Sequence, residues 1–216
     1  MEYFTDLLDN ALSRTVAQKI MDQILNGELK PGDQIVESSY AEMFNTSRSP
    51  IREAIYLLST EGLIERVPRK GAFIKGYTLT EVQDLLDIRN NLEILAAQRI
   101  HEPQKKKTLL NKMKKIVKDM EKCSNQMEYT HLNYAFHFTL IKFSESTVIE
   151  GVYSKISLPL LRIQGIHFSI NDTIEKSRKE HRKIYELLKD NQLDELISIL
   201  RKHTEDVIFN IRRQIL

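Results

Sequence analysis

The chain has 216 residues, of which 41% are hydrophobic and 29% charged, and its formal net charge is only +2. This length accommodates one large domain or two ordinary ones. The abundance of Leu, Ile, Lys and Glu, with few Gly and Pro, favours a mainly helical protein. A single cysteine, Cys123, excludes an intramolecular disulfide and suits a reducing cytoplasm, where we expect the protein to act. The acidic first ten residues are unlike a signal peptide, and no apolar run is long enough for a membrane span, so no membrane partner is expected.

The first part of the chain predicts short helices followed by a hairpin. Apolar residues recur with helical spacing, and Gly27 and Gly62 are placed to end helices. After Gly62 the period changes from 3.6 to 2, which is typical of strands. The expected elements are helices over Leu12–Asn26, Ser38–Phe44 and Ser47–Glu61, then strands over Leu63–Val67 and Ala72–Lys75. Helix, helix, turn, helix and hairpin is the order of a winged helix-turn-helix.

The third of these helices has the features of a helix that reads DNA. Ser47 is a good N-cap residue, and Pro50 falls in the first turn, where a missing N–H costs little. Arg48 and Arg52 are four residues apart and therefore share one face, with Ser49 between them. The opposite face is apolar, with Ile51, Ala54, Ile55 and Leu58. A small helix with a buried back and a Ser/Arg front fits the major groove.

Positive charge is concentrated locally although the chain as a whole is nearly neutral. The first 78 residues hold more Asp and Glu than Lys and Arg. Between 48 and 75, however, Arg48, Arg52, Arg66, Arg69, Lys70 and Lys75 outnumber Glu53, Glu61 and Glu65. At the hairpin tip, Gly71 lets the backbone beside Arg69 and Lys70 approach a phosphate or the minor groove.

Four blocks of this region resemble the GntR family of bacterial transcription regulators. They are Asn26–Asp33 (NGELKPGD), Thr46–Ala54 (TSRSPIREA), Glu61–Ile64 (EGLI) and Pro68–Phe73 (PRKGAF). The resemblance implies that residues 1–77 form a winged helix-turn-helix DNA-binding domain. It also implies that Ser47, Arg48, Ser49 and Arg52 contact an operator, with Arg69, Lys70 and Gly71 at the wing.

Residues 78–216 predict an all-α antiparallel bundle, because no segment beyond Thr80 has strand periodicity. The expected helices are Thr80–Ile100, Pro103–Asn125, Glu128–Ser144, Thr147–Ile170, Thr173–Asp190 and Leu193–Ile215. Thr80 with Gln83 predicts a capping box for the first helix, and Asp172 predicts the N-cap of the fifth. Pro159 predicts a kink or break near Ser157.

Three histidines on apolar helix faces, His137, His181 and His203, are candidate metal ligands. Asn133 lies one turn before His137 and shares its face. Three imidazoles and a side-chain oxygen suit Zn²⁺ or another divalent transition metal. The alternative is that these are ordinary core or surface histidines with hydrogen-bond partners. The remaining histidines, His101, His131 and His167, are expected to be surface or packing residues.

This second part resembles the FCD ligand-binding domain of the FadR-type branch of the GntR family. The matching blocks are Asp87–Glu93, Asn133–His137, Glu180-His181 and His203. The resemblance implies an effector-binding and dimerisation domain. It also implies a site for Zn²⁺, Ni²⁺ or Mn²⁺ held by Asn133, His137, His181 and His203. Asn133 stands where many metal-binding members have Asp, and a neutral amide is a weaker ligand than a carboxylate.

Three arginines are candidates for binding an acidic effector. Arg89 is followed four residues later by Glu93, which fits an exposed ion pair. It also fits a guanidinium that points into a pocket and binds a carboxylate bidentately. The family often uses a first-helix arginine for acidic effectors, which favours the second interpretation. Arg162 and Arg178 are further candidates.

Together these patterns predict a DNA-binding transcription regulator and no enzyme. A single reading helix gives little specificity, so a homodimer on a palindromic operator is expected. A small carboxylate metabolite bound in the bundle would relieve repression if it binds the bundle's arrangements with different free energies. A rival hypothesis is a helical metalloenzyme that uses His137, His181 and His203. It leaves the first 77 residues unexplained. A third is a protein-interaction module that uses the wing fold without DNA.

Overall fold

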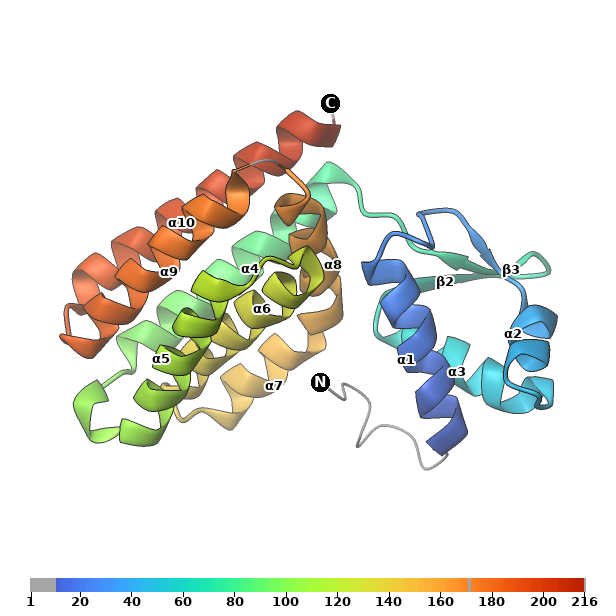
Figure 1. The fold of residues 1–216 in the computed structure, drawn as a ribbon, viewed down its shortest axis with the longest axis horizontal. Coiled ribbons are helices and arrows are strands. Elements are labelled where there is room, and N and C mark those ends of the chain that lie inside the picture. The colour runs from blue at the N-terminus through green and yellow to red at the C-terminus, as the bar shows by residue number, and fades with distance from the viewer. Residues whose placement is uncertain (1–10, 171, 216) are drawn as a thin grey trace. The chain divides into compact units, whose positions relative to one another are not determined.

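A computed structural model describes residues 11–170 and 172–215. The chain divides into two compact units, Met1–Tyr77 and Thr78–Leu216, and each is described by itself (Figure 1). The acidic start of the chain lies outside the described residues. Within them, no helix combines the length and the apolar character that a membrane crossing requires.

The first unit contains helices and a small antiparallel sheet. Its elements are α1 (Ala11–Leu25), β1 (Gln34–Ile35), α2 (Glu37–Met43), α3 (Arg48–Thr60), β2 (Ile64–Val67) and β3 (Gly71–Ile74). The strand order is β1-β3-β2, so the sheet has three strands where the sequence predicted only the β2–β3 hairpin. Strand β1 was missed because two residues are too few to show alternation. Its pairing of Gln34 with Phe73 is a long-range contact.

The core of the first unit lies between α1 and α3. Val16 and Ile20 on α1 are fully buried, as are Ile51 and Leu58 on α3. These apolar residues recur at helical spacing, so each helix turns one stripe inward and leaves the other face in solvent. Ser47 is the N-cap residue of α3, although its side chain makes no capping hydrogen bond.

The second unit is a helical bundle built around α6. Its elements are α4 (Leu79–Gln98), a short 3₁₀ helix η1 (Pro103–Lys105), α5 (Lys107–Lys122), α6 (Gln126–Lys142), α7 (Thr147–Lys155), α8 (Ser157–Phe168), α9 (Thr173–Lys189) and α10 (Leu193–Ile215). Helix α6 contacts α4, α5, α7 and α8. It is therefore buried on several sides, and its polar residues Asn133 and His137 lie in the interior.

Two details of helix capping in the second unit differ from the sequence prediction. The capping box of α4 is formed by Thr78 and Glu81 and not by Thr80 and Gln83, because the helix begins at Leu79. Asp172 precedes α9 as predicted but has a φ of 64° and makes no side-chain capping bond. The break predicted before Pro159 is confirmed, since α7 ends at Lys155 and α8 begins at Ser157.

Candidate functional site

Helix α3 presents a polar face to solvent. Arg48, Ser49 and Arg52 are exposed on it, while Ile51, Ala54 and Leu58 are buried against the rest of the unit. Tyr56 continues the exposed row one turn beyond Arg52, and 60% of its surface is accessible. Tyr56 is not among the residues predicted from the sequence to contact an operator, although its spacing of four from Arg52 places it on this face.

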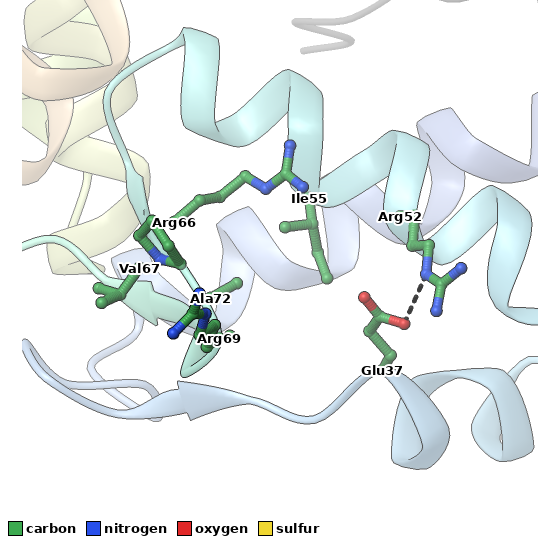
Figure 2. A pocket seen from close by; sticks show the side chains of 9 residues that line it. Glu37, Arg52, Ile55, Arg66, Val67, Arg69 and Ala72 are labelled. Atoms are coloured by element: carbon green, nitrogen blue, oxygen red, sulfur yellow. Dashed lines mark hydrogen bonds and ion pairs between the residues drawn. The ribbon is translucent and has the colours of Figure 1, made fainter.

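A groove of about 370 Å³ lies between α3 and the β2–β3 hairpin (Figure 2). Its cations are Arg52, Arg66 and Arg69, and Glu37 is the carboxylate in its lining. Nε of Arg52 donates a hydrogen bond of 2.8 Å to Oε2 of Glu37 at the start of α2. Arg52 and Ile55 of α3 line one side of the groove, and residues of the hairpin, including Arg66 and Arg69, line the other.

The hairpin tip depends on a glycine. Gly71 has a φ of 109°, which favours glycine, and a Cβ there would lie 3.0 Å from Nε2 of Gln34. That amide donates a hydrogen bond of 2.9 Å to the carbonyl of Lys70. Gln34 on β1 thus holds the tip, and a side chain at Gly71 would crowd the amide that does so.

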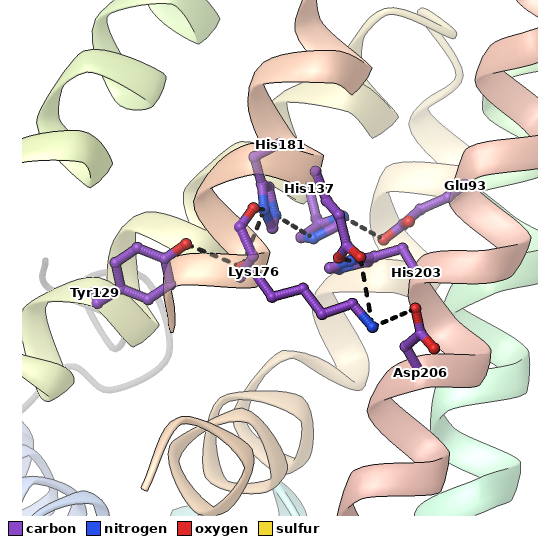
Figure 3. Close-up of polar contacts among 9 residues, drawn as sticks. Glu93, Tyr129, His137, Lys176, His181, His203 and Asp206 are labelled. Carbon is purple, nitrogen blue, oxygen red and sulfur yellow. Dashed lines mark hydrogen bonds and ion pairs between the residues drawn. The ribbon is translucent and has the colours of Figure 1, made fainter. Parts of the chain in front are cut away.

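In the second unit, three histidines converge from three helices (Figure 3). Candidate ligand atoms of His137 on α6, His181 on α9 and His203 on α10 all lie within 4.8 Å of one another. Nε2 of His137 is 2.9 Å from Nε2 of His181. The three residues are separated by many positions in the sequence, so only the packing of the helices brings them together.

Each imidazole has an oxygen atom beside Nδ1, and in His181 and His203 the two atoms are hydrogen-bonded. Nδ1 of His181 is 2.6 Å from the carbonyl of Ser177, and Nδ1 of His203 is 2.6 Å from Oε2 of Glu180. Nδ1 of His137 is 3.0 Å from Oε1 of Glu93. Acceptors at these positions favour the tautomer with hydrogen on Nδ1, which leaves the Nε2 lone pairs directed inward. A cation among the three Nε2 atoms would relieve the repulsion between these lone pairs.

Burial keeps His137 and His181 neutral. Burial and then the nearby charge of Arg89 lower the pKa of His137 to about 3, although Glu93 acts in the opposite direction. Burial also lowers the pKa of His181 well below its ordinary value, and His137 adds to the effect. Neutral imidazole is the form that binds a metal ion.

Asn133 offers an oxygen from the same helix as His137. Its Oδ1 is buried and has no hydrogen-bond partner among the described residues. Buried polar atoms in native proteins nearly always have a partner, so this atom is available to a ligand. Three imidazole nitrogens and one oxygen are a donor set that suits a divalent transition metal.

Arg89 and Glu93 form a buried ion pair next to the histidines. Nε of Arg89 donates to Oε1 of Glu93 over 2.7 Å, and neither side chain is exposed. The alternative of an exposed i,i+4 pair is therefore wrong. Burial by itself would raise the pKa of Glu93, but Arg89 and then His137 outweigh it and lower that pKa to about 2. Nη2 of Arg89 has no hydrogen-bond partner among the described residues.

The other two candidate arginines occupy different positions. Arg162 is buried on α8. Arg178 instead joins α9 to the end of α5: Nε donates to the carbonyl of Met120 over 3.0 Å, and Nη2 donates to the carbonyl of Cys123. Because Nη1 also binds Glu175, the guanidinium of Arg178 is occupied, and we do not retain its effector role.

Two interior residues were not predicted as parts of this site. His167 on α8 is buried, and burial followed by the charges of His203 and Arg89 lowers its pKa to about 3. Tyr153 on α7 is also fully buried. Burial raises its pKa, which Arg89 opposes. No local spacing in the sequence connects either residue to the histidines, so only the fold could reveal them.

Comparison with known proteins identifies both units. Residues 12–74 match the family described as bacterial regulatory proteins, gntR family, and residues 84–206 match the FCD domain. The chain belongs to the GntR family. It is a DNA-binding transcriptional regulator of that family with an FCD effector-binding domain.

Individual GntR relatives cover most of the chain. The HTH-type transcriptional regulator YdhC of Bacillus subtilis is 30% identical over 174 residues, which are 79% of this chain and 78% of that protein. The gluconate operon transcriptional repressor of Bacillus licheniformis is 25% identical and covers 89% of this chain and 82% of its own length.

Solved structures share the fold. A GntR transcriptional regulator from Rhodococcus sp. RHA1 has a TM-score of 0.78 at 17% identity, covering 94% of this chain and 98% of its own. McbR/YncC of Escherichia coli has a TM-score of 0.71 at 17% identity and covers 96% of this chain and 100% of its own.

Proposed function

We propose that this GntR-family protein is a repressor whose affinity for its operator is controlled by a small carboxylate metabolite bound beside a divalent metal in the FCD domain. The observation that carries the proposal is the convergence of three buried imidazoles beside Arg89. Repression is the activity named for the gluconate operon relative, and we extend it to this chain.

The metal site would be held by Asn133, His137, His181 and His203. When bound, a Zn²⁺, Ni²⁺ or Mn²⁺ ion would supply positive charge that attracts a carboxylate. The Nδ1 partners described above support the site because they orient the ligand rings. Elemental analysis and native mass spectrometry of protein purified without chelator would test it. We expect about one metal per chain, lost in His181→Ala and retained in the control His101→Ala, which alters an exposed histidine.

Arg89 supports the proposed acidic effector. Its Nε is bonded to Glu93, while Nη2 is buried, has no hydrogen-bond partner within residues 11–170 and 172–215, and is available to an anion. Arg162 on α8 is a second proposed contact. Arg89 is already neutralised by Glu93, so the bound metal would supply the excess positive charge. Calorimetric titration of a panel of small carboxylic acids, with and without Zn²⁺, would test this expectation.

Operator contact is proposed for Ser47, Arg48, Ser49 and Arg52 on α3 and for Arg69, Lys70 and Gly71 at the wing. The exposure of the α3 residues and the groove beside them support this assignment. In a titration with duplexes enriched from a random pool, Arg48→Ala and Arg52→Ala should each weaken binding, and Lys19→Ala on α1 should not. If neither arginine variant weakens binding, the proposed operator contact is wrong.

We propose that the protein binds a palindromic operator as a homodimer, because one short helix reads too few base pairs for specificity. The FCD domain offers a surface for a second copy. Ile88 and Leu95 on α4 are exposed apolar residues, as are Val148 and Val152 on α7, and these two helices contact each other. Exposed apolar side chains on adjacent helices favour association.

The metalloenzyme hypothesis has less support. Two carboxylates contact the histidines. Glu180 is bonded to Nδ1 of His203, on the side of the ring away from the other histidines, and Glu93, beside His137, is bonded to Arg89 and held at a pKa of about 2. Such a carboxylate is a poor general base at neutral pH. Screening metal-loaded protein against hydrolase and oxygenase substrates tests this rival, and turnover abolished by His137→Ala would favour it.

A further inference from the structure

We infer that the groove between α3 and the hairpin binds one phosphodiester of the operator backbone and that Arg66 is its principal cation. The inference rests on the proposed DNA binding and assigns a contact that is separate from the residues on α3 and at the wing tip. The ligand class is a phosphate of duplex DNA.

Arg66 is placed to reach across the groove. It lies on β2 opposite Ala72 of β3, and its side chain extends from the hairpin toward α3, near Ile55 (Figure 2). The residue is exposed, and among the described residues no carboxylate forms an ion pair with it. An arginine that is held at the wall of a groove without a counterion is suited to binding an anion.

The neighbouring cations have other constraints. Nε of Arg52 is bonded to Glu37, which directs that guanidinium toward the α2 side of the groove and leaves its terminal nitrogens available for base edges. Arg69 lies in the hairpin turn, where its φ is 64°. Arg66 is the groove cation that lies on a regular strand. The pairing of β2 with β3 fixes the position of its backbone.

The position also predicts what kind of contact Arg66 makes. Base edges are read by the N-terminal part of a recognition helix that enters the major groove, whereas flanking elements contact phosphates. Arg66 is on the hairpin and not on α3. It should therefore contribute affinity without sequence preference, in contrast to Arg48 and Arg52.

The test measures binding of the full-length protein to two duplexes over a range of KCl concentrations. One duplex is enriched from a random pool, and the other has the same composition in scrambled order. Arg66→Gln should weaken binding to both duplexes by the same factor. It should also reduce the slope of log K against log [KCl] by about 0.9 for each bound protomer, while Arg66→Lys retains the slope.

Two controls make the result specific. Lys19→Gln on α1 removes the same charge from an exposed position that does not line the groove, and it should leave the slope unchanged. Circular dichroism of Arg66→Gln should match the unaltered protein. In addition, one neutral methylphosphonate scanned along the enriched duplex should weaken the unaltered protein at a position where it has no further effect on Arg66→Gln.

The outcomes separate this inference from the proposed function. If the unaltered protein binds neither duplex in a salt-dependent way, the proposed DNA binding itself fails. If the unaltered protein binds but Arg66→Gln keeps the full salt slope, the phosphate assignment is overturned while DNA binding stands. A loss confined to the enriched duplex would also overturn it, because that result indicates a base contact.

Discussion

Glu93 connects an arginine to a histidine inside the FCD domain. Its Oε1 accepts a hydrogen bond of 2.7 Å from Nε of Arg89 and lies 3.0 Å from Nδ1 of His137. All three side chains are buried. One carboxylate therefore neutralises the buried guanidinium and also contacts a candidate metal ligand. Any substitution of Glu93 should therefore change both the stability of the bundle and the position of His137 in the histidine cluster.

Glu93→Ala should destabilise the protein strongly. The variant leaves Arg89 charged and buried without its counterion, and breaking one side of a buried pair typically costs about 3–5 kcal/mol. Urea denaturation followed by circular dichroism would measure the loss. The control is Glu102→Ala, which removes an exposed pair with Lys105 and should cost no more than about 1 kcal/mol. Similar losses in both variants would contradict the structural role of Glu93.

Glu180→Gln should weaken metal binding without removing a ligand. Oε2 of Glu180 accepts from Nδ1 of His203 at 2.6 Å, and loss of such a partner typically reduces metal affinity by about 10- to 100-fold. Competition between the protein and a fluorescent chelator for Zn²⁺ would measure the change. Glu175→Gln, on the same helix but paired with Arg178, is the matched control. Unchanged Zn²⁺ affinity in Glu180→Gln would show that His203 needs no such partner.

Thr78→Ala should destabilise the second unit by about 1 kcal/mol, because it removes the side chain that caps α4. Thr78 accepts from the backbone N–H of Glu81, and the carboxylate of Glu81 accepts from the N–H of Thr78. Urea unfolding monitored by circular dichroism would measure the effect. Thr80→Ala, which alters an exposed threonine already inside the helix, should cost less. Equal losses would be inconsistent with the observed start of α4.

Ile88→Asp should weaken the proposed dimer at least about tenfold, since placing a carboxylate at a central apolar contact should cost at least about 1.4 kcal/mol, which is a tenfold change in affinity. Sedimentation velocity over a range of protein concentrations would follow the monomer–dimer equilibrium. Phe209→Asp makes the same kind of change at an exposed apolar residue on α10 and serves as the control. If the double variant Ile88→Asp/Val152→Asp still forms the dimer, the interface does not lie on this surface of α4 and α7.

The sequence by itself determined what depends on neighbours along the chain. Arg48 and Arg52 had to share a face of α3 because any α-helix brings residues four apart to the same side. The same spacing placed Asn133 one turn before His137. The break before Pro159 followed from the missing N–H of proline, and the confirmed fold class followed from the change of hydrophobic period after Gly62.

Tertiary structure decided the features that depend on packing between distant segments. The spacing of Arg89 and Glu93 is the same in an exposed pair and a buried one, and only the surrounding helices make it buried. Arg178 was a further, weaker candidate, and only the fold showed that carbonyls at the end of α5 accept its hydrogen bonds. The convergence of His137, His181 and His203 requires α6, α9 and α10 to pack together. Periodicity along one helix carries no information about which side chains of other helices it will meet.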